Sequence, residues 1–145
     1  MKSNNTIYFA GSIRGGRDDQ PLYLAIIKML AEYGDVLTEH IGRKDLEETG
    51  EKLSDKEIFD RDTDWIRKST ILIAEVTNPS MGVGYEIGLA ESLGKPIVCL
   101  YRKIEGKNIS AMLKGNDKIM CIEYRVLEDL IPIFAAHFQE EIISV

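Results

Sequence analysis

One short loop carries the clearest anion-binding chemistry of this 145-residue chain. It reads Gly11-Ser12-Ile13-Arg14-Gly15-Gly16-Arg17 and follows the apolar stretch 6–10. Three glycines let the backbone curl closely around a ligand, and successive N–H groups in such a curl bind anions. The two arginines add fork-shaped cations suited to phosphate oxygens. No Gly-Lys-Ser/Thr follows, so this is not a Walker loop. The pattern favours phosphate binding over the alternative, a flexible turn with solvated arginines.

Glu86 is the first candidate catalytic residue. It follows the turn 77–82, and we expect it in the first turn of a helix over 83–93. The helix dipole there favours the carboxylate form, so Glu86 could act as a nucleophile or base. A surface residue that complements the dipole is an equally good interpretation of the spacing. The Gly82-Val83-Gly84 sequence beside it is too short to indicate a dinucleotide site.

Asp62 breaks the apolar pattern of a second predicted helix. Ile58, Phe59, Trp65 and Ile66 form an apolar arc, and at 100° per residue Asp62 falls in its middle. A carboxylate in such a place is costly unless it is paired or used. Asp62 either makes a structural hydrogen bond or helps to form a ligand cavity, where it could share a pocket with Glu86.

The elements that must position these residues alternate between apolar, β-rich runs and helix-period segments. Strands are expected at 6–10, 35–38, 70–76, 96–100 and 118–123, and helices at about 22–33, 54–68, 83–93, 110–113 and 127–143. Pro21 suits the first turn of the first helix, and Gly34 is expected to end it. Ser54 and Glu57 predict a capping box for the second helix, and Gly94 a cap after the third. The polar stretch 39–53 is expected to be a loop.

This alternation predicts a doubly wound, Rossmann- or flavodoxin-like α/β fold, with a five-stranded parallel sheet and helices on both faces. The central strands are continuous apolar runs, as expected for a sheet covered on both sides. Ligands of such folds bind outside the carboxyl ends of the strands. The loops after the first, third and fourth strands are therefore the expected sites.

Composition narrows the function classes. The length suits a single domain over residues 1–145, with ordinary globular usage of 44% hydrophobic and 29% charged residues. The net charge of −6 and a pI of about 5.0 argue against general nucleic-acid or membrane binding. No apolar run approaches the ~20 residues of a membrane span, and no secretory signal is expected at the N-terminus.

The cysteines and histidines indicate neither a disulfide nor a metal site. Cys99 and Cys121 lie in apolar stretches and are expected to be reduced core thiols of a cytoplasmic protein. His40 and His137 lie far apart in sequence and lack metal-ligand spacing. We expect no metal and no other cofactor.

Six ordered motifs resemble those of the 2′-deoxynucleoside 5′-phosphate N-hydrolases, within the wider nucleoside 2-deoxyribosyltransferase superfamily. They are IYFAGSIRGGR at 7–17, LTEH at 37–40, DTDW at 62–65, AEVT at 74–77, SMGVGYEIG at 80–88 and SAM at 110–112. The resemblance spans nearly the whole chain. It implies cleavage of the N-glycosidic bond of a deoxynucleoside 5′-monophosphate, giving a free base and 2-deoxyribose 5-phosphate.

The resemblance also assigns roles to residues. Glu86 would be the nucleophile that forms a covalent glycosyl-enzyme, Tyr8 would orient it, and Asp62 would assist protonation of the leaving base. The substrate- and phosphate-binding residues would be Gly11, Ser12, Ile13, Arg14, Gly15, Gly16, Arg17, Ser80, Gly82, Gly84, Ser110, Ala111 and Met112. Ser110 and its neighbours would come from the second subunit of a homodimer.

Two other functions remain open from the sequence. A nucleoside 2-deoxyribosyltransferase would use the same covalent intermediate with a second base as acceptor, although the two-arginine loop favours nucleotide substrates. A non-catalytic nucleotide-binding protein would need the phosphate loop but would have no use for Tyr8, Asp62 and Glu86 together. Base preference does not follow from the sequence.

Overall fold

The computed structural model describes residues 4–13, 19–40 and 52–143. Its strands are β1 (Asn5–Gly11), β2 (Gly34–Leu37), β3 (Ile71–Glu75), β4 (Ile97–Arg102) and β5 (Ile119–Tyr124). Its helices are α1 (Gln20–Leu30), α3 (Asp55–Lys68), α4 (Met81–Ser92), α5 (Ala111–Lys114) and α6 (Leu130–Ile143). A 3-10 turn at Leu127–Asp129 precedes α6. No helix in these ranges combines the length and hydropathy needed to cross a membrane.

The five strands form one sheet in the order β2-β1-β3-β4-β5, and every neighbouring pair is parallel. The predicted doubly wound α/β fold is therefore confirmed. Connections run outward in opposite directions from β1 and β3, so the loops after these two strands diverge and leave a crevice at the carboxyl edge of the sheet. Gly11 and Glu75 end β1 and β3 as register partners at this edge.

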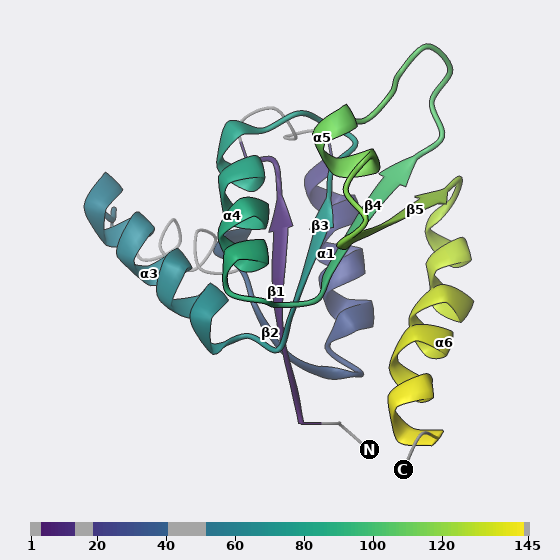
Figure 1. The fold of residues 1–145 in the computed structure, drawn as a ribbon, viewed down its shortest axis with the longest axis horizontal. Coiled ribbons are helices and arrows are strands. Elements are labelled where there is room, and N and C mark those ends of the chain that lie inside the picture. The colour runs from purple at the N-terminus through teal and green to yellow at the C-terminus, as the bar shows by residue number, and fades with distance from the viewer. Residues whose placement is uncertain (1–3, 14–18, 41–51, 144–145) are drawn as a thin grey trace.

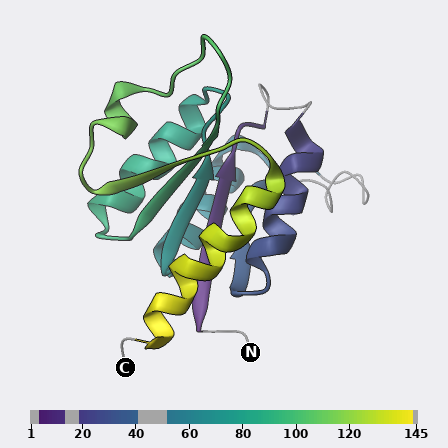
Figure 2. The same ribbon diagram turned by 90° about the vertical axis from the view of Figure 1, so that its right-hand side faces the viewer.

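Helices cover both faces of the sheet (Figures 1 and 2). Alternate side chains of β1 point to opposite faces, so Ile7 and Phe9 pack with α1 and α6, whereas Tyr8 and Ala10 pack with α3 and α4. The alternation in β1 thus directs Tyr8 toward the layer that carries Asp62 and Glu86.

The second predicted helix has its expected start. The Ser54 hydroxyl accepts from the Glu57 amide at 3.1 Å, and the Glu57 carboxylate accepts from the Ser54 amide at 3.1 Å. This reciprocal capping box confirms the sequence prediction, and it begins α3 at the residue that the pattern indicated.

The expected role of Gly34 is wrong. Helix α1 ends at Leu30, and Gly34 is instead the first residue of β2. A Cβ at position 34 would lie 2.3 Å from the Asn5 carbonyl oxygen, so only glycine permits this approach of β2 to β1. Gly94, by contrast, follows α4 with φ of 72°, as expected of a helix-ending glycine.

Helix α4 begins two residues earlier than expected. Ser80 is its N-cap, and the Ser80 hydroxyl accepts from the Val83 amide at 3.3 Å. With Met81 as the first helical residue, Glu86 lies in the second turn and not in the first. Because the dipole effect fades beyond the first turn, the chemistry of Glu86 must depend mainly on its side-chain neighbours.

Candidate active site

A cleft of about 500 Å³ opens at the carboxyl edge of the sheet. It is lined by Gly11, Ser12, Ile13, Glu39, Asp55, Ile58, Pro79, Ser80, Met81, Gly82, Val83 and Glu86. These residues come from the loops after β1, β2 and β3 and from the starts of α3 and α4. Its volume lies within the range of small-molecule sites, and its position is the one that the fold favours for ligands.

Tyr8 and Glu86 meet at the base of this cleft. The Tyr8 hydroxyl donates a hydrogen bond to Oε2 of Glu86, from the middle of β1 to the second turn of α4. Tyr8 is buried, and desolvation, followed by the negative charge of Glu86, raises the pKa of its phenol. Tyr8 therefore remains a neutral donor that fixes the orientation of the glutamate.

The pKa of Glu86 is raised to about 7, mainly because burial penalises the carboxylate. The hydrogen bond from Tyr8 lowers this pKa, whereas the negative charges of Asp62 and Glu39 raise it. A carboxyl group with a pKa near neutrality can exchange between its two protonation states at little cost. The sequence pattern leaves open whether Glu86 is a surface residue; in the structure it is half-buried, lines the cleft and accepts a hydrogen bond from Tyr8.

Asp62 lies on the buried face of α3, where the apolar arc placed it, and is 6% exposed. Burial raises its pKa, while the adjacent Arg61 opposes that rise. The Arg61 Nε lies 2.9 Å from Oδ1 of Asp62, and its guanidinium stacks over the Trp65 ring at 4.7 Å. The negative charge of Asp62 raises the pKa of Glu86, although Asp62 is not among the residues that line the cleft.

Two residues near the cleft were not singled out from the sequence. Glu39 lines the cleft and lowers the pKa of Asp62 through a side-chain hydrogen bond. His40 is 5% exposed and packs against Phe9 and Tyr23 on the α1 side of the sheet, with Nε2 3.0 Å from the Gly11 carbonyl oxygen. Both belong to the LTEH motif, but they come from the loop after β2, which the strand pattern does not mark as a site. Only the strand order brings that loop beside Tyr8.

The phosphate-loop residues are only partly described. Gly11, Ser12 and Ile13 line the cleft, whereas Arg14, Gly15, Gly16 and Arg17 lie outside the described residues. A Cβ at Gly11 would lie 3.1 Å from His40 Nε2, so a larger residue there would need His40 to shift slightly. On α4, Ser80 and Gly82 line the cleft. Gly84 does not, and a Cβ at that position would meet open space.

Ser110, Ala111 and Met112 are exposed at the start of α5. The Ser110 hydroxyl accepts from the Met112 amide at 3.1 Å, and these residues are not among those that line the cleft of their own chain. Among the described residues, no cluster of histidine, cysteine, aspartate and glutamate is arranged to hold a metal ion.

The site can perform chemistry that needs both a carboxylate and a proton donor. Glu86 supplies an oriented carboxylate with a pKa near neutrality. Burial raises the pKa of Asp62, which favours its protonated form. An oriented carboxylate and a carboxyl group with a raised pKa can divide the tasks that cleavage of a glycosidic bond requires.

Known proteins with similar sequences fit this chemistry. The family model for nucleoside 2-deoxyribosyltransferase matches residues 7–122. The chain is 50% identical over 113 residues to 5-hydroxymethyl-dUMP N-hydrolase of Tetraodon nigroviridis, covering 77% of this chain and 80% of that protein. It is 53% identical over 110 residues to the Danio rerio protein of the same name, covering 75% and 77%.

A solved structure shares the fold. The CMP N-glycosidase BcmB of Clostridium botulinum superposes with a TM-score of 0.64 over 90% of this chain and 98% of that one. The two sequences are only 17% identical, so this likeness concerns the fold.

Proposed function

This chain belongs to the nucleoside 2-deoxyribosyltransferase family and is an N-glycosidase, and from that premise we propose that it hydrolyses 2′-deoxynucleoside 5′-monophosphates through a covalent intermediate on Glu86. The observation that carries the proposal is the Tyr8–Glu86 hydrogen bond at the base of a cleft lined by the loop after β1. That loop brings Ser12 and Ile13 to the same cleft, where a 5′-phosphate would bind.

The first step forms an ester between Glu86 and the sugar. A carboxylate oxygen of Glu86 attacks C1′, the C1′–N bond breaks, and the electron pair of that bond leaves with the base. Asp62, whose pKa is raised by burial, gives a proton to the base. As positive charge develops at C1′, it stabilises the ionised form of Glu86 and offsets the burial that raises its pKa.

The second step hydrolyses this ester. Water attacks C1′, the bond from C1′ to the Glu86 oxygen breaks, and a proton of the water returns to Asp62. The products are 2-deoxyribose 5-phosphate and the original carboxylate. Binding energy from the phosphate, which does not react, holds C1′ against Glu86. We propose that Arg14 and Arg17 contribute to this binding with the glycines of their loop.

We propose 5-hydroxymethyl-dUMP as the first substrate to test, because relatives that are 50% and 53% identical carry that name. The enzyme would be incubated with this nucleotide, with dUMP, dTMP and dGMP, and with UMP, and base release would be followed by chromatography. We expect a free base and 2-deoxyribose 5-phosphate from at least one deoxynucleotide. Release from none of them would contradict the proposal and favour a binding protein.

A labelled free base, added to the same reaction, separates hydrolysis from base exchange. We expect no label in the nucleotide, because water is the proposed acceptor of the glycosyl group. Label that appears in the nucleotide at the rate of base release would assign a transferase.

The corresponding nucleosides test the phosphate site. Because they lack the charge-assisted phosphate contacts, their kcat/KM should be about tenfold or more below that of the nucleotides.

We also propose a homodimer in which Ser110 completes the site of the partner subunit. Exposed apolar side chains support it: Met81 is 95% exposed, Met112 81% and Tyr85 59%. Exposed side chains of this kind, near the cleft and on α5, are expected to be covered by another protein surface. A two-fold interface is isologous, so each subunit would lend one serine and receive one.

Subunit mixing tests this arrangement. Glu86→Gln and a strongly impaired Ser110 variant would be mixed and allowed to exchange subunits. In a mixed dimer one site carries both changes and the other neither, so roughly a quarter of all sites should regain the wild-type composition. If Ser110 serves its own subunit, every site keeps one change. Activity that stays at the parental average after confirmed exchange would exclude the shared site.

We propose that the enzyme acts in the cytoplasm. Cys99 and Cys121 are register partners on β4 and β5 and are both free thiols. Unbridged neighbouring thiols are typical of a reducing compartment.

A further inference from the structure

A second buried glutamate lies at the same edge of the sheet but outside the cleft. Glu75 is the last residue of β3 and is completely buried. Its carboxylate accepts from the Thr77 amide at 2.7 Å, from the Thr77 hydroxyl at 3.0 Å and from the hydroxyl of Tyr124. Because its oxygens already have three donors, Glu75 has no place in the reaction proposed for Glu86.

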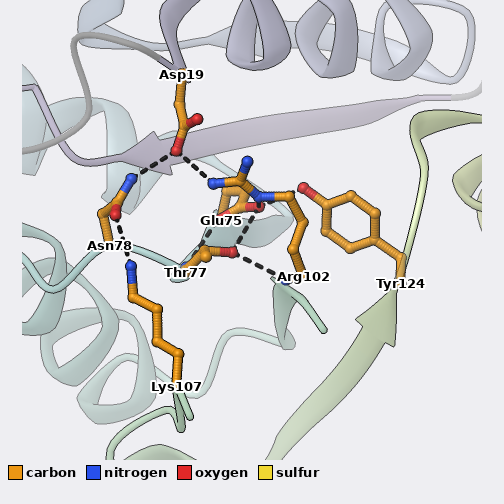
Figure 3. Close-up of polar contacts among 7 residues, drawn as sticks. All are labelled: Asp19, Glu75, Thr77, Asn78, Arg102, Lys107 and Tyr124. Atoms are coloured by element: carbon orange, nitrogen blue, oxygen red, sulfur yellow. Dashed lines mark hydrogen bonds and ion pairs between the residues drawn. The ribbon is translucent and has the colours of Figure 1, made fainter. Parts of the chain in front are cut away.

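Arg102 connects this glutamate to the start of α1. Its Nη2 lies 2.5 Å from Oδ2 of Asp19, and its Nε lies 3.8 Å from Oε2 of Glu75. The Arg102 backbone amide also donates to the Thr77 hydroxyl at 2.9 Å. Figure 3 shows the guanidinium between the two carboxylates, with Thr77 beneath it. One cation from β4 therefore fixes groups from the ends of two other elements.

Asn78 extends the connection to the next residue of the β3–α4 loop. Its side-chain amide donates to Asp19 at 2.5 Å, and its carbonyl oxygen accepts from Lys107 at 2.9 Å. We refer to Asp19, Glu75, Thr77, Asn78, Arg102, Lys107 and Tyr124 together as the Glu75 network (Figure 3). It joins the start of α1, the β3–α4 loop, the β4–α5 loop and the end of β5.

The β3–α4 loop is the part of this network that reaches the cleft. Pro79 and Ser80 follow Asn78 directly and line the cleft, and Ser80 is the N-cap of α4, the helix that carries Glu86. The network thus holds two residues that precede Pro79. Thr77 is bound by Arg102 of β4, and Asn78 is bound by Asp19 at the start of α1. A shift of Thr77 would move the start of α4 relative to Tyr8 on β1.

We propose that Thr77 and Arg102 of the Glu75 network are positioning residues that hold the catalytic helix and set the distance from Glu86 to the substrate, whereas Tyr124 supports the fold from β5. This proposal rests on the function proposed for Glu86. None of the network residues needs to touch the substrate. They act because a misplacement of about 1 Å between a nucleophile and its target can cost up to about a hundredfold in rate.

Two substitutions of Thr77 form a matched pair. Thr77→Val keeps the shape of the side chain but removes the hydroxyl that joins Glu75 to Arg102, whereas Thr77→Ser keeps the hydroxyl. We expect kcat for the deoxynucleotide to fall about tenfold in Thr77→Val and to stay within about twofold in Thr77→Ser. The pH at which activity falls should not move, because Tyr8 and Asp62 still surround Glu86.

Two further variants separate positioning from stability. Tyr124→Phe removes a donor to Glu75 from β5 and leaves the β3–α4 loop intact, so it should lower Tm with little change in kcat. Asp60→Asn removes an exposed ion pair with Lys56 and should change neither. If Thr77→Val only lowers Tm, as Tyr124→Phe does, and keeps the wild-type kcat, the positioning role is overturned.

Binding of 2-deoxyribose 5-phosphate, measured by calorimetry, gives a readout without turnover. Thr77→Val should weaken this binding several-fold, because Ser80 lines the cleft, and Thr77→Ser should not. Equal binding by all the Thr77 proteins would also overturn the proposal. Failure of the proposed function would look different: the wild-type protein would release no base, or Glu86→Gln would retain turnover.

Discussion

Two glutamates near the carboxyl edge of the sheet, Glu75 fully buried and Glu86 half-buried, differ in their surroundings. Glu86 and Glu75 each accept a hydrogen bond from a tyrosine hydroxyl, Tyr8 for the first and Tyr124 for the second. Glu86 opens onto the cleft, whereas Glu75 is sealed among donors from its own loop and from β5. Burial and a tyrosine partner are therefore not sufficient to mark a catalytic carboxylate.

The surrounding charges make the difference. Asp62 and Glu39 face Glu86 and raise its pKa, and Arg61 opposes them only weakly. Glu75 has Arg102 beside it, together with a backbone amide and a threonine hydroxyl. A buried carboxylate whose oxygens are paired with a cation and hydrogen-bond donors has a structural role. A carboxylate whose burial is only partly compensated keeps a pKa near neutrality and remains available for chemistry.

The largest expected effect is the loss of turnover in Glu86→Gln. An amide is a far weaker nucleophile than a carboxylate, so base release should fall about a thousandfold or more, equivalent to at least about 4 kcal/mol. Single-turnover assays with the preferred deoxynucleotide would measure it. Glu91→Gln, at the other glutamate of α4, is the matched control and should keep wild-type turnover. Turnover by Glu86→Gln close to the wild-type rate would show that Glu86 is not the nucleophile.

The second effect is on stability and concerns Glu75→Gln. This change removes one of the two carboxylates beside Arg102 and should reduce the free energy of unfolding by about 3 kcal/mol, measured by urea denaturation at pH 7.

Glu86→Gln should instead increase the free energy of unfolding at high pH. Because the pKa of Glu86 is raised on folding, the stability that its protonated form contributes is lost as the pH rises through about 7.

Above that pH, Glu86→Gln should therefore be more stable than the wild-type protein. A loss below about 1 kcal/mol in Glu75→Gln would mean that Arg102 does not depend on Glu75. The contrast between a scaffold carboxylate and a reactive one would then disappear.

The sequence predicted the architecture because hydrophobic periodicity reports which faces are buried. It placed the five strands and the capping box of Ser54, and it failed at Gly34, where only the approach of β2 to Asn5 explains the glycine. It also placed the start of α4 too late, because Gly82 and Gly84 look like a turn when the cap at Ser80 is not considered.

The site was harder to predict than the fold. Asp62 was identifiable because a charge interrupts an apolar arc, and the structure places it near Glu86, as expected. Glu39 and most of the Glu75 network were not, because their partners lie on other elements, and Arg61 was not, because no apolar pattern marks its contacts with Asp62 and Trp65 of its own helix. Glu75 in particular reads as the end of an apolar strand: two of its hydrogen bonds come from Thr77 in the following loop, and the third comes from Tyr124 on β5, which only the fold brings near.

The third prediction concerns pH and has two arms. In the wild-type protein, kcat/KM should fall on the acidic side with an apparent pKa near 7, the pKa of Glu86. Tyr8→Phe removes the hydrogen bond that lowers this pKa, so the fall should move to higher pH by about half a unit to one unit. Asp62→Asn removes a negative charge that raises the pKa of Glu86, so the fall in kcat/KM should move to lower pH, by a smaller amount.

Rate measurements from pH 5 to 9 on the residual activity of both variants would establish these directions. Opposite shifts would identify the group that titrates as Glu86. Shifts in the same direction, or none, would mean that another group controls the acidic limb.

The smallest expected effect is that of Arg61, which forms an ion pair with Asp62. Arg61→Gln removes a hydrogen bond and a charge from Asp62 and should raise the pKa of that carboxyl group, with a smaller rise at Glu86. We expect the acidic limb to move upward by less than about half a unit and kcat/KM at pH 7 to fall by no more than about threefold. Arg67→Gln, at an exposed position in the last turn of α3, is the control. If the shift for Arg61→Gln were as large as that for Tyr8→Phe, Glu86 would depend on a neighbouring cation as strongly as we infer that Glu75 depends on Arg102. The proposed difference between the two glutamates would then be wrong. A small shift would leave it intact, because the guanidinium that stacks on Trp65 would then serve mainly to orient Asp62.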